Sequence, residues 1–173
     1  QHGYVIYCGS VSKSLSPSFR LGWFCIPPRL QHLRAKLLTQ NVSVNTPLQL
    51  GFTDLIYSRA YREHLNYLKP ILMHQVEQYR QFIIKTFAGI DIRINQPQGG
   101  YALWIQMPEH YDSLALYHYA QQKGINIVPG LVFGEDERYN NYFRLNAGHE
   151  LTDEVAQAIQ CLADGCKIQM VQV

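Results

Sequence analysis

The chain carries Ser10-Val11-Ser12-Lys13-Ser14-Leu15-Ser16-Pro17-Ser18-Phe19-Arg20 shortly after the apolar run Tyr4-Val5-Ile6-Tyr7. This pattern predicts a strand that ends in a turn presenting hydroxyls, a lysine and an arginine. A lysine amine forms a Schiff base with an aldehyde, and an arginine fork with nearby hydroxyls binds phosphate. The segment therefore predicts a site for a phosphorylated aldehyde.

The residues around this segment predict an alternation of strands and helices. Residues 4–8 are apolar on both faces, as in a buried parallel strand. A second apolar run covers residues 21–26, and a short helix is expected over residues 28–39. Thr46 is expected to cap the next helix, with Pro47 at its first position.

A long helical pattern runs from about Arg59 to Phe87, with apolar residues every three or four positions. Pro70 lies inside it and cannot donate a hydrogen bond to the carbonyl of Asn66, so a kink or a break is expected there. Gly89 is the expected stop. The start of this helix is the expected division between two domains, residues 1–58 and residues 59–173.

The second part of the chain changes to short strands and helices. Strands are expected at residues 90–94, 101–107, 125–128 and 142–145, and the first two are expected to pair antiparallel. Asp112 or Ser113 would cap a helix that ends near Lys123, and a final helix would begin near Thr152. The expected fold class is α/β, with an α+β small domain.

Composition excludes several classes of protein. The formal net charge is only +2 with no run of basic residues, so the chain shows no nucleic-acid surface of its own. The sequence contains no stretch of about 18 apolar residues, so no membrane span is expected. The first residues show no targeting pattern. The four cysteines form no Cys-x-x-Cys pair and are expected to be reduced thiols of a cytoplasmic protein. The scattered histidines predict no metal site.

Four motifs in order carry a family resemblance over about residues 5–165. They are the segment from Ser10 to Trp23, Gln98-Gly99-Gly100-Tyr101-Ala102-Leu103-Trp104, the run from Gly124 to Phe133 with Pro129-Gly130, and Tyr142-Phe143-Arg144-Leu145-Asn146. Together they resemble the fold-type I pyridoxal-phosphate (PLP) aminotransferases. Within that superfamily they are closest to the kynurenine/aminoadipate aminotransferases and the MocR-type (GntR family) transcriptional regulators.

The resemblance implies a role for each candidate site residue. Lys13 would bind the PLP aldehyde and carry a proton between the substrate and the cofactor. Ser10, Ser12 and Arg20 would hold the phosphate. Arg144 would clamp the substrate carboxylate, with a structural ion pair as the alternative reading.

Other motif residues allow two readings. Gly99, Gly100, Pro129 and Gly130 would shape loops near the substrate or serve ordinary turns. The aromatic residues of these motifs are expected to be core rather than substrate contacts; they are Tyr101, Trp104 and Phe133. Ser18 stands where the family commonly has glycine, and would cost about 1 kcal/mol if that position needs a positive φ.

The resemblance also implies a place in a larger fold. With twelve residues before Lys13, the chain resembles the C-terminal part of such a protein. Residues 1–58 would be the last strands and helices of the large PLP-binding domain. Residues 59–173 would be the small domain, an antiparallel or mixed sheet covered by helices. The isolated chain would bind PLP weakly or not at all.

Three functions follow from the resemblance. We favour the C-terminal region of a MocR-type regulator that senses PLP and an amino-acid or amine effector, forms a homodimer, and binds DNA through a separate N-terminal winged helix. The alternative is part of a metabolic aminotransferase. A third reading is a stable α/β fragment without activity, so whether this chain itself is an enzyme is left open.

Overall fold

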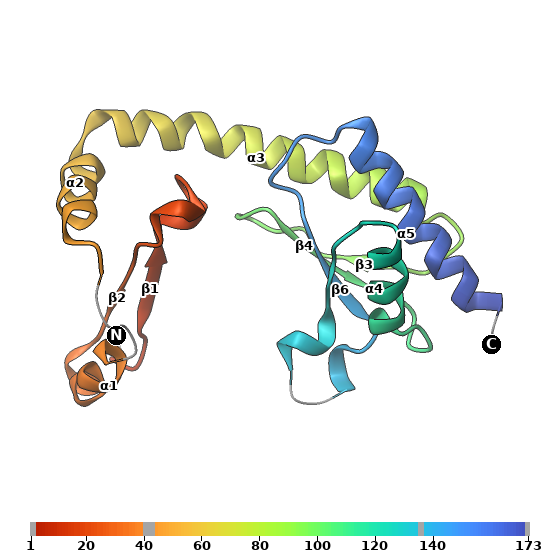
Figure 1. The fold of residues 1–173 in the computed structure, drawn as a ribbon, viewed down its shortest axis with the longest axis horizontal. Coiled ribbons are helices and arrows are strands. Elements are labelled where there is room, and N and C mark those ends of the chain that lie inside the picture. The colour runs from red at the N-terminus through yellow and green to blue at the C-terminus, as the bar shows by residue number, and fades with distance from the viewer. Residues whose placement is uncertain (1–2, 40–43, 135–136, 172–173) are drawn as a thin grey trace. The chain divides into compact units, whose positions relative to one another are not determined.

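A computed structural model of the chain describes residues 3–39, 44–134 and 137–171 (Figure 1). The fold is mixed α/β, as predicted. The chain divides into two compact units, Gln1–Tyr67 and Leu68–Val173, and each is considered by itself. The predicted domain boundary, between residues 58 and 59, lies at the start of a helix that has residues in both units. That boundary stays a prediction. No helix in the described ranges has the length and apolarity needed to cross a membrane.

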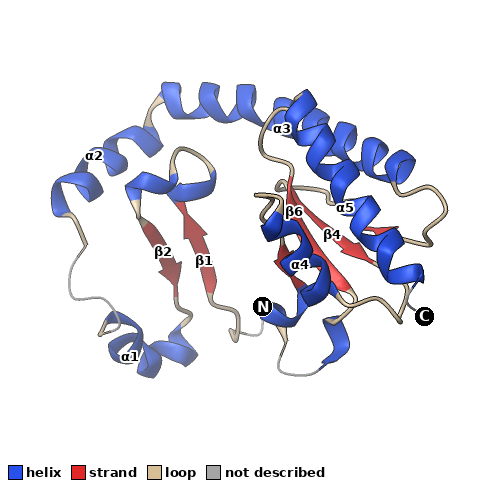
Figure 2. Ribbon diagram, turned by 45° about the vertical axis from the view of Figure 1, so that its right-hand side comes forward, coloured by secondary structure: helices blue, strands red, loops and turns tan. Residues whose placement is uncertain are grey.

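The first unit begins with a two-stranded antiparallel sheet, β1 (Tyr7–Ser10) and β2 (Gly22–Cys25) (Figure 2). The prediction of a buried parallel strand over residues 4–8 was wrong, because the strand starts later and most of it is exposed. Residues 11–21 connect the two strands, and they are too few for the crossover that a parallel pair needs. They form two 3-10 turns instead, Val11–Lys13 and Pro17–Phe19.

Helices complete the first unit. The predicted helix over residues 28–39 is a 3-10 segment, Pro28–Leu33, followed by the short helix α1 (Arg34–Leu38). In α2 (Thr46–Tyr57) the cap is Asn45, and Thr46 is the first helical residue. The Asn45 side chain accepts a hydrogen bond from the backbone N–H of Leu48 at 3.0 Å, which corrects the predicted Thr46 cap.

Helix α3 (Arg59–Thr86) is continuous through Pro70, so the predicted break is absent. Both Pro70 and Asn66 are exposed, which leaves water to satisfy the Asn66 carbonyl that loses its helical donor. Beyond α3, Gly89 adopts a φ of 93°, as expected for a helix stop. In the first unit, Val11, Leu21 and Phe52 form a small core against which Tyr61 of α3 packs.

The second unit contains an antiparallel sheet in the order β3-β4-β6-β5. Its strands are β3 (Arg93–Ile94), β4 (Ala102–Gln106), β5 (Val128–Pro129) and β6 (Tyr142–Asn146). The antiparallel pairing predicted for the first two strands of this half is confirmed. Helix α4 (Ser113–Gln122) is capped by Asp112, one of the two predicted caps, and α5 (Asp153–Val171) is the last helix of the described residues.

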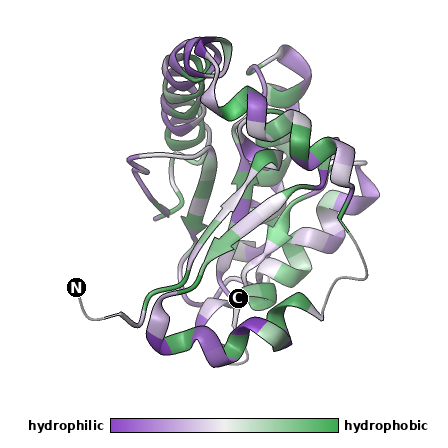
Figure 3. Ribbon diagram, turned by 90° about the vertical axis from the view of Figure 1, so that its left-hand side faces the viewer, coloured by the Kyte–Doolittle hydropathy of each residue, from purple (hydrophilic) through white to green (hydrophobic). Residues whose placement is uncertain are grey.

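Alternation along β4 and β6 gives this sheet two unlike faces. Leu103, Ile105 and Phe143 are fully buried and pack in one cluster with residues of α3, α4 and α5. Each of these helices has both buried and exposed positions, and hydrophobic and hydrophilic residues alternate along the helical ribbons in Figure 3, as in amphipathic helices. The opposite face carries Trp104 and Arg144, which are directly paired across β4 and β6. Because side chains alternate along a strand, these two residues lie on the sheet face opposite the hydrophobic core.

Candidate functional site

The first candidate site is the lysine loop, residues 10–20, which joins β1 to β2. Val11 is completely buried, and its N–H donates to the carbonyl of Leu21 at 2.9 Å. Around this anchor, Ser10, Lys13 and Arg20 are exposed. The Ser10 hydroxyl oxygen accepts the N–H of Ser12 at 3.2 Å, which closes the turn that presents Lys13. The loop is therefore fixed by its apolar side and presents its polar side outward.

Arg20 has a left-handed backbone, with φ 48° and ψ 32°. Among the described residues other than glycine, it alone has a positive φ. Ser18 lies inside the second 3-10 turn, where Ser16 Oγ accepts its N–H at 3.2 Å. The backbone strain of a positive φ is therefore absent at Ser18 and present at Arg20. A residue other than glycine costs roughly 1–2 kcal/mol in that conformation.

The two ends of the loop lie close together because both flanking positions are glycine. A Cβ on Gly9 would overlap the Trp23 ring, and a Cβ on Gly22 would come within 2.9 Å of the Gly9 carbonyl oxygen. Beside them lies a hollow of about 440 Å³, whose wall includes Phe19 and Arg20. Arg20 thus borders a hollow large enough for a small ligand, while Ser10, Ser12 and Lys13 are not among its lining residues.

The charge around the loop is one-sided. Five cationic side chains precede Asp54, which is the first carboxylate in the sequence; they are Lys13, Arg20, Arg29, Arg34 and Lys36. A stretch of chain that carries cations and no carboxylates favours the binding of anions. Hydroxyls, a guanidinium and a lysine in such a stretch fit a phosphate group and an aldehyde, so the residues present match the phosphate and aldehyde ends of PLP.

Two residues of α3 hold the loop from the other side. The Tyr61 hydroxyl donates to Ser14 Oγ at 3.1 Å, and His64 Nε2 lies 2.7 Å from the Ser14 carbonyl oxygen. Ser14 follows Lys13 directly. Sequence reasoning missed both contacts, because partners about fifty positions apart leave no local pattern.

The second candidate site lies on the open face of the sheet in the second unit. Arg144 is exposed, and its guanidinium carbon lies 5.3 Å from the centre of the Phe133 ring. Trp104 and Tyr139 complete the wall of a hollow of about 230 Å³, which we call the aromatic hollow. The structure places Ser10, Ser12, Lys13 and Arg20 on one loop of the first unit and Arg144 in the second unit.

The aromatic residues of the motifs are divided between core and surface. Tyr101 packs against the core cluster, as expected. Phe133 is 44% exposed and, with Trp104, lines the aromatic hollow, so the expected core role does not hold for Phe133. Sequence reasoning missed Tyr139, whose only signal is its place three residues before Tyr142 in an aromatic segment.

Gly130 fixes the turn that carries Phe133. Its N–H donates to the Oγ of the buried Ser113 at 3.4 Å. A Cβ there would overlap the Tyr139 carbonyl oxygen and come within 2.8 Å of the Tyr142 carbonyl oxygen. Gly99 and Gly100 face open space, although Gly100 has a φ of 77°. Gly130 therefore sets the geometry of the aromatic hollow, and the substrate-loop role of the other motif glycines stays a prediction.

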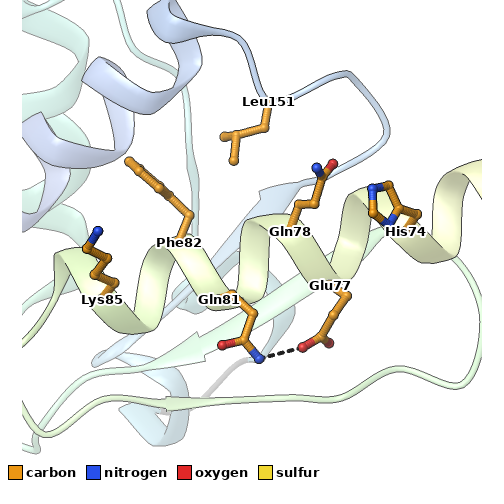
Figure 4. A pocket seen from close by; sticks show the side chains of 7 residues that line it. All are labelled: His74, Glu77, Gln78, Gln81, Phe82, Lys85 and Leu151. Carbon is orange, nitrogen blue, oxygen red and sulfur yellow. Dashed lines mark hydrogen bonds between the residues drawn. The ribbon is translucent and has the colours of Figure 1, made fainter.

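Two further hollows of the second unit lack such chemistry. One, of about 430 Å³, lies between α3 and Leu151, with His74, Glu77 and Lys85 in its wall (Figure 4). Hydrogen bonds from Gln81 and Arg80 lower the pKa of Glu77. The other lies between Lys123 and Cys161. Within the described ranges, no group of three or more His, Cys, Asp or Glu residues is placed to hold a metal ion.

Comparison with known proteins relates the whole chain to one family. Residues 1–161 match the family described as aminotransferase class I and II. The chain is 29% identical over 162 residues to the uncharacterized HTH-type transcriptional regulator YdcR of Escherichia coli, covering 94% of this chain and 34% of that protein. It is 27% identical to aromatic-amino-acid aminotransferase 1 of Thermococcus litoralis, covering 98% of this chain and 41% of that enzyme.

The fold agrees with that relation. The chain superposes with a TM-score of 0.78 on the α-aminoadipate aminotransferase LysN of Thermus thermophilus, which was crystallised with N-(5'-phosphopyridoxyl)-L-leucine. The identity is 22%, and the match covers 97% of this chain and 43% of that one. The predicted aminotransferase fold is confirmed. The chain spans about a third of the length of the regulator and about two fifths of the length of the enzymes.

Proposed function

Because the chain belongs to the class I and II aminotransferase family, we propose that its lysine loop binds PLP in a regulator of the MocR type. The observation that carries the proposal is the loop itself, which carries Ser10, Ser12, Lys13 and Arg20 in a stretch of sequence without carboxylates. When bound, PLP supplies an electron sink for chemistry at the α-carbon of an amino acid.

The residues of this chain would divide the work by their chemistry. Ser10, Ser12 and Arg20 hold the phosphate through hydroxyl donors and a guanidinium fork. The Lys13 amine would hold the aldehyde carbon and, when free of it, would move a proton at its Nζ atom. Arg144 binds the carboxylate of an amino-acid effector.

The regulator reading is supported by the similarity to HTH-type transcriptional regulators over 94% of this chain. In such a protein, PLP and the effector would shift the conformation of a homodimer, and DNA would be bound by an N-terminal domain outside this chain. The protein would then act in the cytoplasm, where its DNA is.

A metabolic aminotransferase is the second candidate. It is favoured by the 27% identity to an aromatic-amino-acid aminotransferase, which covers 98% of this chain. The same side chains would then transfer an amino group between an amino acid and a 2-oxo acid.

Cofactor binding is tested on the intact protein with PLP, followed by borohydride reduction and peptide mass spectrometry. We expect a pyridoxyl group on Lys13, lost in Lys13→Ala and kept in Lys36→Ala, which removes another lysine of the same carboxylate-free region. Reduction that labels no lysine, or labels both variants alike, contradicts the proposal.

A second assay separates the regulator from the enzyme. A regulator changes its DNA affinity with the effector and shows no repeated turnover with a 2-oxo acid. Steady transamination of an amino acid and a 2-oxo acid, without an effect of either on DNA binding, would establish the metabolic enzyme instead.

A further inference from the structure

The aromatic hollow is built almost entirely from ring faces and edges. Trp104 meets Phe133 edge-on at 5.2 Å and Tyr139 at 5.8 Å between ring centres, and it stacks on Tyr142 at 5.3 Å. Tyr139 and Tyr142 meet edge-on at 5.5 Å. Such offset and edge-on contacts are the arrangements that aromatic pairs prefer, so the wall is well ordered.

The strands and turns fix this wall in place. Trp104 lies opposite Arg144 in the β4–β6 register, and its backbone N–H donates to Asn95 Oδ1 at 2.8 Å. Phe133 ends the turn that starts at Gly130, where no side chain fits. The sheet thus positions Trp104 and Arg144, and the adjoining 3-10 turns position Phe133 and Tyr139.

The size of the hollow suits one aromatic ring. Its volume is about 230 Å³, and an apolar cavity of about 150 Å³ is large enough to hold benzene. The remaining space allows the short carbon chain that links a ring to a carboxylate. A methyl or hydroxymethyl side chain would leave most of the hollow unfilled.

The charge of the wall further limits which ligand groups can bind in the hollow. Among the described residues that line it, Arg144 alone is charged, so a cationic ligand group near it would meet a like charge. An acidic side chain would lose its hydration among the rings. A ligand with one carboxylate and one ring can pair its carboxylate with Arg144 and place its ring against the aromatic side chains.

We propose that the aromatic hollow receives the ring of an aromatic amino acid whose carboxylate is bound by Arg144. This inference rests on the proposed function for the identity of the ligand as an amino acid. It adds that Trp104, Phe133 and Tyr139 determine specificity, through contact with the ligand side chain.

The test uses two carboxylates that lack an amino group, so that it does not depend on cofactor chemistry. Binding of 3-phenylpropionate and of propionate to the intact protein is measured by titration calorimetry. We expect 3-phenylpropionate to bind at least about tenfold more tightly, with a more negative heat-capacity change from the buried ring. Equal affinity for the two would overturn the inference, whatever the outcome of the pyridoxyl labelling at Lys13.

Variants locate the effect. Tyr139→Leu should weaken 3-phenylpropionate about fivefold to tenfold and leave propionate unchanged, while Tyr139→Phe keeps the ring and the affinity ratio. Arg144→Gln should weaken both carboxylates alike. If Tyr139→Leu weakens both ligands by the same factor, or if 2-phenylethylamine binds as tightly as 3-phenylpropionate, the hollow does not select a ring beside a carboxylate.

Discussion

The Nε2 atom of His64 lies 2.7 Å from the carbonyl oxygen of Ser14, the residue that follows Lys13. His64 belongs to α3, and Tyr61, one turn earlier, hydrogen-bonds the Ser14 side chain. The backbone next to Lys13 is thus held by a helix distant in sequence. The two contacts make Tyr61 and His64 positioning residues for the lysine.

Replacing His64 should loosen the lysine loop. In His64→Ala, the Ser14 carbonyl loses a partner whose net contribution is about 0.5–1.5 kcal/mol. We expect faster hydrogen exchange at the N–H of Leu15, which donates to the Val11 carbonyl at 2.9 Å. His74→Ala, an exposed histidine of the same helix, should leave that rate unchanged. Unaltered exchange at Leu15 in His64→Ala would show that the contact does not hold the loop.

Because Arg20 has a left-handed backbone, replacing it with glycine should change the stability of the protein and its PLP binding in opposite directions. Arg20→Gly removes a strain of about 1 kcal/mol, so we expect an equal or higher melting temperature. It also removes the guanidinium, so PLP binding, followed by visible absorbance, should weaken. Ser18→Gly should not raise the melting temperature, because Ser18 lies in a 3-10 turn. A gain in stability at position 18 and none at position 20 would contradict the assignment of strain.

Gly130 should tolerate no side chain. Gly130→Ala places a methyl group against the carbonyl oxygens of Tyr139 and Tyr142, and overpacking of this kind costs about 1–3 kcal/mol. The melting temperature should fall and the affinity for 3-phenylpropionate should weaken. Gly99→Ala meets nothing within 4 Å and should stay within about 0.5 kcal/mol of the parent. Equal stability of the two variants would contradict the close approach.

The cysteines should differ in reactivity. Cys166 is fully buried, and this burial raises the pKa of its thiol to about 12. Cys8 and Cys25 are exposed. At neutral pH we expect a thiol reagent to label Cys8 and Cys25 in the folded protein, and Cys166 only after unfolding. Labelling of Cys166 at the rate of Cys8, read by peptide mass spectrometry, would exclude a stably closed core.

The same thiol makes stability depend on alkaline pH. The pKa of Cys166 is about 12 in the folded protein and 9.0 ordinarily, so between these values the folded state binds more protons. Stability from this group is fully present below pH 9 and is lost as the pH rises toward 12. In urea unfolding at pH 9–10, the parent should lose stability more steeply than Cys166→Ala. Parallel curves would contradict the burial of the thiol.

Local patterns predicted much of the fold. The Asp112 cap, the Gly89 stop and the antiparallel pair of strands depend on residues close in sequence, and each is present. The errors have local causes as well. The Asn45 side chain provides the cap that was expected from Thr46. An exposed Pro70 costs the helix one hydrogen bond without ending it, so of the kink or break expected there the break is absent and the kink stays a prediction.

The candidate sites were predicted unevenly. The sequence places Ser10, Ser12, Lys13 and Arg20 within eleven positions, so their grouping on one loop follows from spacing alone. The partners Tyr61 and Tyr139 come from elements that only the fold brings to their sites. Phe133 was expected in the core because aromatic residues usually are, and only the packing of its turn shows that it is exposed.

The strict alternation in β6 has a consequence for how this sequence can change over generations. Insertion or deletion of one residue in this strand would exchange its two faces, placing Arg144 in the core and Phe143 in water. A protein with such a change would fail to fold before it could lose its ligand. Purifying selection on folding alone therefore keeps position 144 in register with Trp104, whichever residue stands there.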